Sequence, residues 1–253
     1  MRQQINTHMQ NSQADIVTNG PYTIINCGRK NASTVADALV DLGAYLQIAI
    51  ADVKQSSKTP SAAYTTFFKD ESIATDVATL LTNVTTGDPI YPANSFSNGS
   101  AIFVCLSEPG QMHYVNATND KIDAYSVCQN TEQASFTITN SVYTVLCPTF
   151  FAPPPGLPAG YPNSVPKPSP GKTTSDCLAV DAKTGQFIGD GNSLTAFAPW
   201  FLLEGLVHYY LATAATLAPN YYDPNECAGL NAPQAATNAH NYVYYAASEW
   251  SLH

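Results

Sequence analysis

The feature that most restricts how this chain can fold is a proline-rich stretch at residues 148–176. It holds nine of the 18 prolines in the 253-residue sequence. Proline has no amide hydrogen and a fixed φ, so such a stretch forms neither a regular helix nor a central strand. We therefore expect a long surface loop. Because the sequence after it is too short for an independent domain, we predict a single domain over 22–253, preceded by a polar N-terminal segment at 1–21.

Apolar periodicity and residue type predict both helices and strands on either side of this loop. Apolar residues at helical spacing predict helices at residues 31–56, 64–82, 197–217 and 233–250. Short runs of β-branched and aromatic residues between Gly, Pro and Asn predict strands at residues 101–106, 121–128, 134–140 and 141–147. This mixture predicts the α+β fold class.

Six cysteines are scattered singly along the chain: Cys27, Cys105, Cys128, Cys147, Cys177 and Cys227. Their number is even, and no pair has the C-x-x-C spacing of a zinc knuckle or redox site. This pattern is typical of three disulfides formed in an oxidising compartment, the alternative being buried free thiols in a cytosolic protein. Six cysteines allow fifteen pairings, so the connectivity stays open. One option is that Cys147 and Cys177 clamp the proline-rich loop between them.

The charge balance excludes several classes of partner. Charged residues make up 11% of the chain, and the formal net charge is −9. This argues against nucleic acid, whose phosphates need a basic face, and against an anionic membrane surface. The apolar stretch 194–218 is interrupted by Glu204, and a charge at mid-membrane is costly, so we predict a buried helix and no membrane insertion. The polar first 20 residues lack the core of a signal peptide. We expect a secreted, extracellular protein given in its mature form.

The stretch FLLEGLVHYYL at residues 201–211 is apolar almost throughout, yet it carries Glu204 and His208 four residues apart. On a helix these positions share one face, so both side chains should point into a cleft or the core. Three interpretations fit the pair. It is a buried polar pair that satisfies itself, half of a metal site, or a metal-free acid–base pair in which the carboxylate sets the histidine tautomer.

The same stretch resembles the H-E-x-x-H helix of a zinc metallopeptidase with two substitutions. Glu204 and His208 take the two ligand positions, and Gly205 takes the position of the general base. Further segments resemble, in the same order, parts of the fungal deuterolysin-like (aspzincin) family of secreted metallopeptidases: CGRKNASTVADALVDLGAYLQIAIADV, AYTTFFKD, VYTVLCPTFF, DPNEC and NAHNYVYYAASEW. The resemblance covers most of residues 22–250. It implies a zincin-like α+β fold, with helices around a small mixed sheet.

Three positions depart from the pattern of that family. Gly205 has no group able to take a proton, and the loss of a general base typically costs about 10²–10⁴ in rate. The resemblance places Pro219, which has no ligating side chain, where the family has an Asp ligand beyond the helix. The nearest carboxylate is Asp223, which we keep as a further metal candidate. His240 stands where the family usually has Asp in its closing helix.

The changes at positions 204 and 240 look reciprocal if the two side chains face each other. One explanation is a swapped hydrogen-bonded pair that keeps the core polar. The other is a rebuilt metal site of Glu204, His208 and His240, for which zinc is the expected ion. The remaining histidines lie in polar stretches and receive no role: His8, His113 and His253.

Two functional classes follow from the resemblance and its departures. The first is a non-catalytic relative that binds a protein or peptide ligand through the former active-site cleft. The second is a metal-dependent endopeptidase or other hydrolase with the rebuilt Glu/His site. The missing base at Gly205 favours the first class. Three tyrosines either line the expected cleft or pack amphipathically in the interior: Tyr209, Tyr222 and Tyr242.

Overall fold

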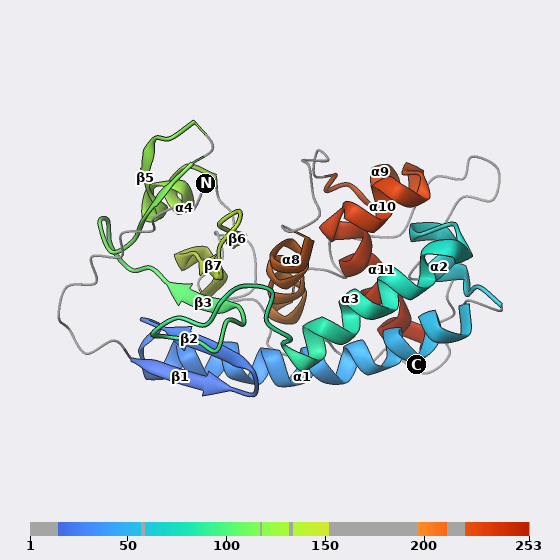
Figure 1. Ribbon diagram of the computed structural model, residues 1–253, viewed down its shortest axis with the longest axis horizontal. Helices are drawn as coiled ribbons and strands as arrows, with labels where there is room; N and C mark the ends of the chain where they lie inside the picture. Colours follow the sequence, from blue (N-terminus) through green and yellow to red (C-terminus); the bar gives the residue numbers. More distant parts are fainter. Residues whose placement is uncertain are drawn as a thin grey trace.

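The computed structural model describes residues 15–56, 59–116, 118–131, 134–151, 197–211 and 221–252. These residues form an α+β fold, as the sequence predicts. Strands gather at one end of the molecule and helices at the other, and the long helix α1 runs beneath both (Figure 1).

The main sheet has five strands in the order β1-β2-β3-β7-β6. Their bounds are β1 Ile16–Asn19, β2 Tyr22–Ile25, β3 Ile102–Cys105, β6 Ser135–Thr137 and β7 Tyr143–Leu146. The central strands β2, β3 and β7 run parallel, and the edge strands β1 and β6 pair antiparallel to them, so the sheet is mixed. Every residue of the three central strands is buried, as is typical of parallel strands covered on both faces.

Three of the expected strands are found, but the stretch 121–128 is strand only at its start. β5 covers Lys121–Asp123 and pairs with β4 (His113–Val115) in a separate two-stranded sheet. The helix α4, Ala124–Thr131, begins directly afterwards, because the Asp123 carboxylate accepts a hydrogen bond from the Tyr125 amide at 3.1 Å. Strands β1, β2 and β4 were not expected. β1 lies inside the segment 1–21 that the sequence marks only as polar.

The first predicted helix is confirmed as α1, Gly28–Ser56, which packs against three other helices, α3, α8 and α11. The helix expected at 64–82 is interrupted. α2, Ala62–Phe67, ends where Lys69 adopts a left-handed φ of 63°. A short 3-10 turn, η1 (Glu71–Ile73), then leads into α3, Ala74–Thr86.

Helix α1 is also the one helix among the described residues that is long and apolar enough to cross a membrane. The sequence pointed instead to 194–218. In this structure the apolar face of α1 packs on the neighbouring helices, as in the core helix of a globular protein.

The C-terminal part is more broken than the sequence suggests. Its helices are α8 Ala198–Leu211, α9 Pro224–Gly229, α10 Ala232–Thr237 and α11 Ala239–Leu252. The single helix expected at 233–250 is split at Asn238, whose buried side chain bonds to the Tyr221 backbone and to Asn241. The turn expected before it contains α9, capped by Asp223.

Two disulfides are present among the described cysteines, Cys27–Cys105 and Cys128–Cys147. The clamp of Cys147 with Cys177 is therefore wrong, because Cys147 is bonded to Cys128. Cys227 is buried and makes no disulfide with another described cysteine. Cys177 lies outside the described residues, so a third disulfide stays a prediction. The loop 148–176 opens with a short helix, α5 (Pro148–Phe151), and the rest of it is likewise outside them.

A buried acidic cluster joins α1, α2 and α11. The Ser61 hydroxyl lies 2.8 Å from Asp52 Oδ2 and 3.3 Å from Glu249 Oε1. The Tyr245 hydroxyl donates to Asp52 Oδ2 at 2.6 Å. Glu249 is 1% exposed, and its burial together with the nearby Asp52 raises the pKa of its carboxyl to about 7. Because this pKa is higher when folded than the ordinary 4.5, the neutral acid stabilises the fold at low pH, and that stability is lost as the pH rises through about 7.

We expect Glu249→Gln to change the free energy of unfolding more favourably at pH 8 than at pH 4. The difference between the two changes should be about 2–3 kcal/mol. Glutamine imitates the neutral acid at every pH and can still accept from Ser61. The measurement is urea unfolding of both proteins at the two pH values, with exposed Glu226→Gln as the control for losing a charge. An equal effect of Glu249→Gln at pH 4 and pH 8 would contradict the expectation.

Candidate functional site

Helix α8 is buried over most of its length. It lies between the sheet and the helical end of the molecule, with β6 and β7 on one side and α1, α3 and α11 on the other (Figure 1). Along its length only Phe201, Glu204 and His208 keep partial exposure. These positions follow the helical repeat, so they form one stripe on one face. The prediction that Glu204 and His208 share a face is confirmed.

Helix α11 brings His240 to the same stripe. His208 Nε2 lies 3.8 Å and His240 Nδ1 lies 3.9 Å from the same oxygen, Oε1 of Glu204. We call these three residues the Glu204 cluster. The side chain of Glu204 is 19% exposed, that of His208 26% and that of His240 14%. The cluster is therefore partly enclosed but still in contact with solvent. Glu204 and His240 therefore face each other, as the reciprocal changes suggest, but at 3.9 Å they do not share the hydrogen bond of a swapped pair.

The contacts inside the cluster are longer than hydrogen bonds. Hydrogen bonds between nitrogen and oxygen span about 2.7–3.2 Å, and both distances exceed that range. His240 Nδ1 is buried and has no hydrogen-bond partner among the described residues. Buried polar atoms in folded proteins are usually paired, so an unpaired one calls for an explanation.

The enclosure of the cluster favours its neutral forms. Burial raises the pKa of Glu204 to about 7. Burial lowers the pKa of His208 to about 4, and burial together with His208 lowers the pKa of His240 to about 4. At neutral pH both imidazoles are therefore uncharged, and each has one nitrogen with a free lone pair. The contacts with Glu204 are then polar contacts rather than ion pairs.

The ring of His240 is held by aromatic neighbours. Tyr222 meets it edge to face, with ring centroids 4.7 Å apart, and Tyr244 lies at 6.0 Å. Tyr222 is 51% exposed, so it forms the solvent side of the cluster. The Tyr244 hydroxyl donates to the Tyr222 carbonyl at 2.7 Å, which fixes the tyrosine backbone next to His240.

Gly205 faces the sheet and leaves no room for a side chain. A Cβ atom at this position would lie 2.6 Å from Cγ2 of Thr144, a fully buried residue of β7. The Thr137 hydroxyl of β6 also donates to the Gly205 carbonyl at 2.9 Å. The helix backbone thus rests directly on the two strands. The position where the resemblance puts a general base is filled by Thr144, a contact that the sequence gives no sign of.

Two of the three tyrosines expected at a cleft are core residues. The Tyr209 hydroxyl donates to the Gly99 carbonyl at 2.6 Å and accepts from the Ile90 amide at 3.1 Å. The Tyr242 hydroxyl donates to the Ala236 carbonyl at 2.9 Å. Both side chains are at most 1% exposed, which fits packing rather than a cleft.

The further metal candidate is used elsewhere. The Asp223 carboxylate accepts from the amides of Asn225 and Glu226 at 2.8 and 3.2 Å and so caps α9. Pro219 lies outside the described residues. Within the part of the chain that the structure describes, no group of three His, Cys, Asp or Glu side chains is already spaced as metal ligands. The Glu204 cluster is not such a group either.

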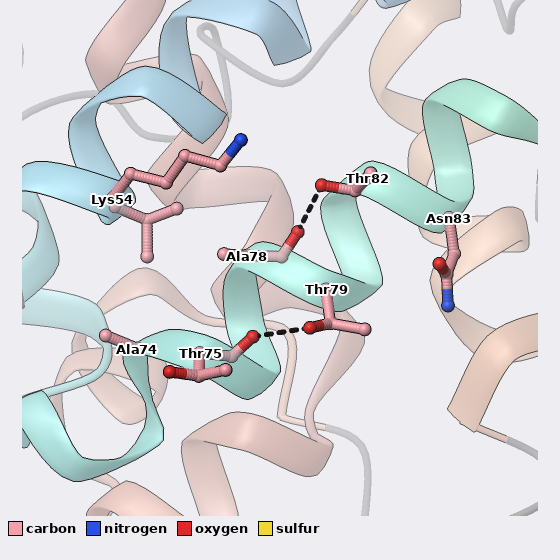
Figure 2. A pocket seen from close by; sticks show the side chains of 8 residues that line it. Lys54, Ala74, Thr75, Ala78, Thr79, Thr82 and Asn83 are labelled. Atoms are coloured by element: carbon pink, nitrogen blue, oxygen red, sulfur yellow. Dashed lines mark hydrogen bonds between the residues drawn. The ribbon is translucent and has the colours of Figure 1, made fainter.

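One groove of the molecule lies between the end of α1 and α3. It encloses about 360 Å³ and lies beside Lys54, Thr79 and Thr82 (Figure 2). The two threonine hydroxyls donate to carbonyls of their own helix at 2.7 Å, so they are not turned toward a ligand (Figure 2). The Glu204 cluster therefore remains the candidate site.

Comparison of the sequence with known proteins does not identify a family for this chain. No protein-family model matches the sequence, and no curated protein matches it significantly.

Proposed function

We propose that this chain is a secreted, metallopeptidase-like protein of the deuterolysin-like kind that does not cleave peptides. It acts by binding a protein or peptide ligand at the partly exposed face around the Glu204 cluster. The observation that carries the proposal is the contact between α8 and β7 at Gly205. The α+β fold with its mixed sheet, and the approach of His240 to Glu204, support the zincin-like scaffold.

A peptidase of this kind needs a polarised water and a group to take its proton. Gly205 offers no such group, and Thr144 occupies the space that a side chain there would need. Glu204 is a poor replacement. Its Oε1 faces both imidazoles of the cluster, so it points where a ligand points, not where the base should be.

Secretion and the class of partner rest on composition and disulfides. Two disulfides among the described residues suit an oxidising compartment. The net charge of −9 disfavours nucleic acid and anionic membranes. A protein or peptide ligand is what the former cleft of a metallopeptidase would bind.

The second candidate is a metal-dependent endopeptidase or other hydrolase with a rebuilt site. The unpaired Nδ1 of His240 favours it, because this atom faces a carboxylate across a gap. This candidate still requires a base from another part of the chain.

The proposal is tested with casein and with a quenched-fluorescence peptide library. We expect no cleavage by the purified protein in excess zinc beyond that of a chelator-treated sample. His208→Ala, purified in the same way, is the control. A contaminating peptidase would cleave equally in both preparations. Chelator-sensitive cleavage that survives repurification and disappears in His208→Ala would replace the proposal with the second candidate.

A further inference from the structure

We infer that Asn98 is the attachment site of an N-linked glycan. The chain holds four N-x-S/T sequences, the acceptor signal for this modification, and they begin at Asn31, Asn83, Asn98 and Asn116. The inference rests on the secretion that the proposed function includes, because the glycan is added in the secretory pathway. It goes beyond that function, since it names a modified residue outside the Glu204 cluster.

Asn98 lies at the surface, in the loop between α3 and β3, and is exposed. Its side-chain oxygen Oδ1 accepts a hydrogen bond from the Ser100 amide at 3.3 Å. Its side-chain nitrogen Nδ2 donates no hydrogen bond to any of the described residues. An N-linked glycan is carried by Nδ2 and leaves Oδ1 unchanged. The modified residue can therefore keep its bond to Ser100.

The two residues after Asn98 are buried and hold the loop in place. Gly99 has a positive φ of 99°, and its carbonyl accepts from the Tyr209 hydroxyl of α8 at 2.6 Å. The Ser100 hydroxyl donates to the Gly87 carbonyl at 2.6 Å. The acceptor signal includes this hydroxyl, so the glycan must be added before the loop folds. These contacts account for Gly99 and Ser100 as loop residues, but they give Nδ2 of Asn98 no structural role.

The other three acceptor sequences are less suited to a bulky, hydrated substituent. Asn31 and Asn83 are half-buried within the helices α1 and α3. Asn116 is half-buried too, and both ends of its amide are used. Its Nδ2 donates to Asp120 Oδ2 at 3.3 Å, and its Oδ1 accepts from the Asp120 amide at 2.8 Å. Because N-linked glycans lie on the surface, the fold favours Asn98.

The attachment is a substitution at the sugar. The anomeric carbon of a lipid-linked oligosaccharide pyrophosphate forms a bond to Asn98 Nδ2. The bond from that carbon to the pyrophosphate breaks, the pyrophosphate leaves with the electron pair, and Nδ2 loses one proton. Only 11% of the residues are charged, so the hydrated surface of the glycan should make the protein more soluble.

The test is glycopeptide mapping of the full chain, secreted from a eukaryotic host behind a cleavable signal peptide. Peptide-N-glycanase converts an asparagine that carries a glycan into aspartate, and tandem mass spectrometry locates the change. The reaction is run in heavy-oxygen water, so that earlier spontaneous deamidation of the Asn98–Gly99 pair is not counted. We expect the labelled aspartate at position 98. The asparagines at 31, 83 and 116 are controls within the same digest.

Two variants provide a second readout on the intact protein. Asn98→Gln should be secreted without the glycan, whereas Asn116→Gln should keep it. An Asn98 without a glycan would overturn the inference, and so would a glycan on any of the other three to the same extent. The signal peptide sends the chain through the secretory pathway in every case, so an unmodified Asn98 counts against the site and not against secretion. The casein test addresses the proposed function separately.

Discussion

Gly205→Ala is expected to lower the free energy of unfolding by about 1–3 kcal/mol, the usual cost of overpacking a core. In an open helix the same change would stabilise by about 1 kcal/mol, because alanine favours helix more than glycine does. Here the added Cβ meets Cγ2 of Thr144 at 2.6 Å. Thr144 is β-branched and fully buried in β7, so it has little freedom to move aside.

A double-mutant cycle with Thr144→Ser isolates this contact. Serine removes Cγ2 and keeps the hydroxyl that bonds to Thr137 at 2.9 Å. We expect Gly205→Ala to be far less harmful when Thr144 is already serine, and urea unfolding of the four proteins measures the coupling. Additive effects would show that Thr144 does not close the position. For the same reason, Gly205→Glu should destabilise more than Gly205→Ala, so restoring the family motif should not restore activity.

The double variant Cys27→Ser with Cys105→Ser should lose about 4 kcal/mol of stability. The disulfide joins residues 78 apart and ties the start of α1 to the end of β3. Without it the unfolded chain regains the entropy of a long loop. Denaturant unfolding under non-reducing conditions measures the loss.

The second disulfide provides a matched control for this effect. Cys128–Cys147 closes a separation of only 19 residues, so its removal should cost less, about 3 kcal/mol. The order of the two losses is the sharper result. A greater loss from the shorter loop would show that strain or residual structure in the unfolded chain, and not loop entropy, sets the contribution of these bonds.

The sequence predicts those elements whose pattern is local. The apolar repeat of α1 and the β-branched run of β3 are both found where the sequence places them. The face shared by Glu204 and His208 also follows from their spacing. Breaks are harder to predict. Helix α2 ends because Lys69 adopts a left-handed backbone conformation. Strand β5 is followed at once by α4 because Asp123 caps that helix. Both breaks are caused by single residues, which the apolar periodicity does not reveal.

The features that decide the candidate site depend on distant segments. Gly205 looks in the sequence like the loss of a base, whereas the structure shows a close contact with Thr144 from another element. The prediction that Tyr209 lines a cleft was wrong for a similar reason. Its hydroxyl donates to a carbonyl 110 residues away in the sequence. A tyrosine is apolar along its ring and polar at its hydroxyl, so it is stable both in a core and at a surface, and its type alone does not predict which.

The most direct test of the account is the rate of peptide cleavage measured against the zinc bound per chain in the same sample. The account predicts no cleavage above the chelator-treated control at any occupancy up to one ion, because α8 carries no base beside the Glu204 cluster. Cleavage that rises in proportion to bound zinc and disappears in Glu204→Gln would contradict it.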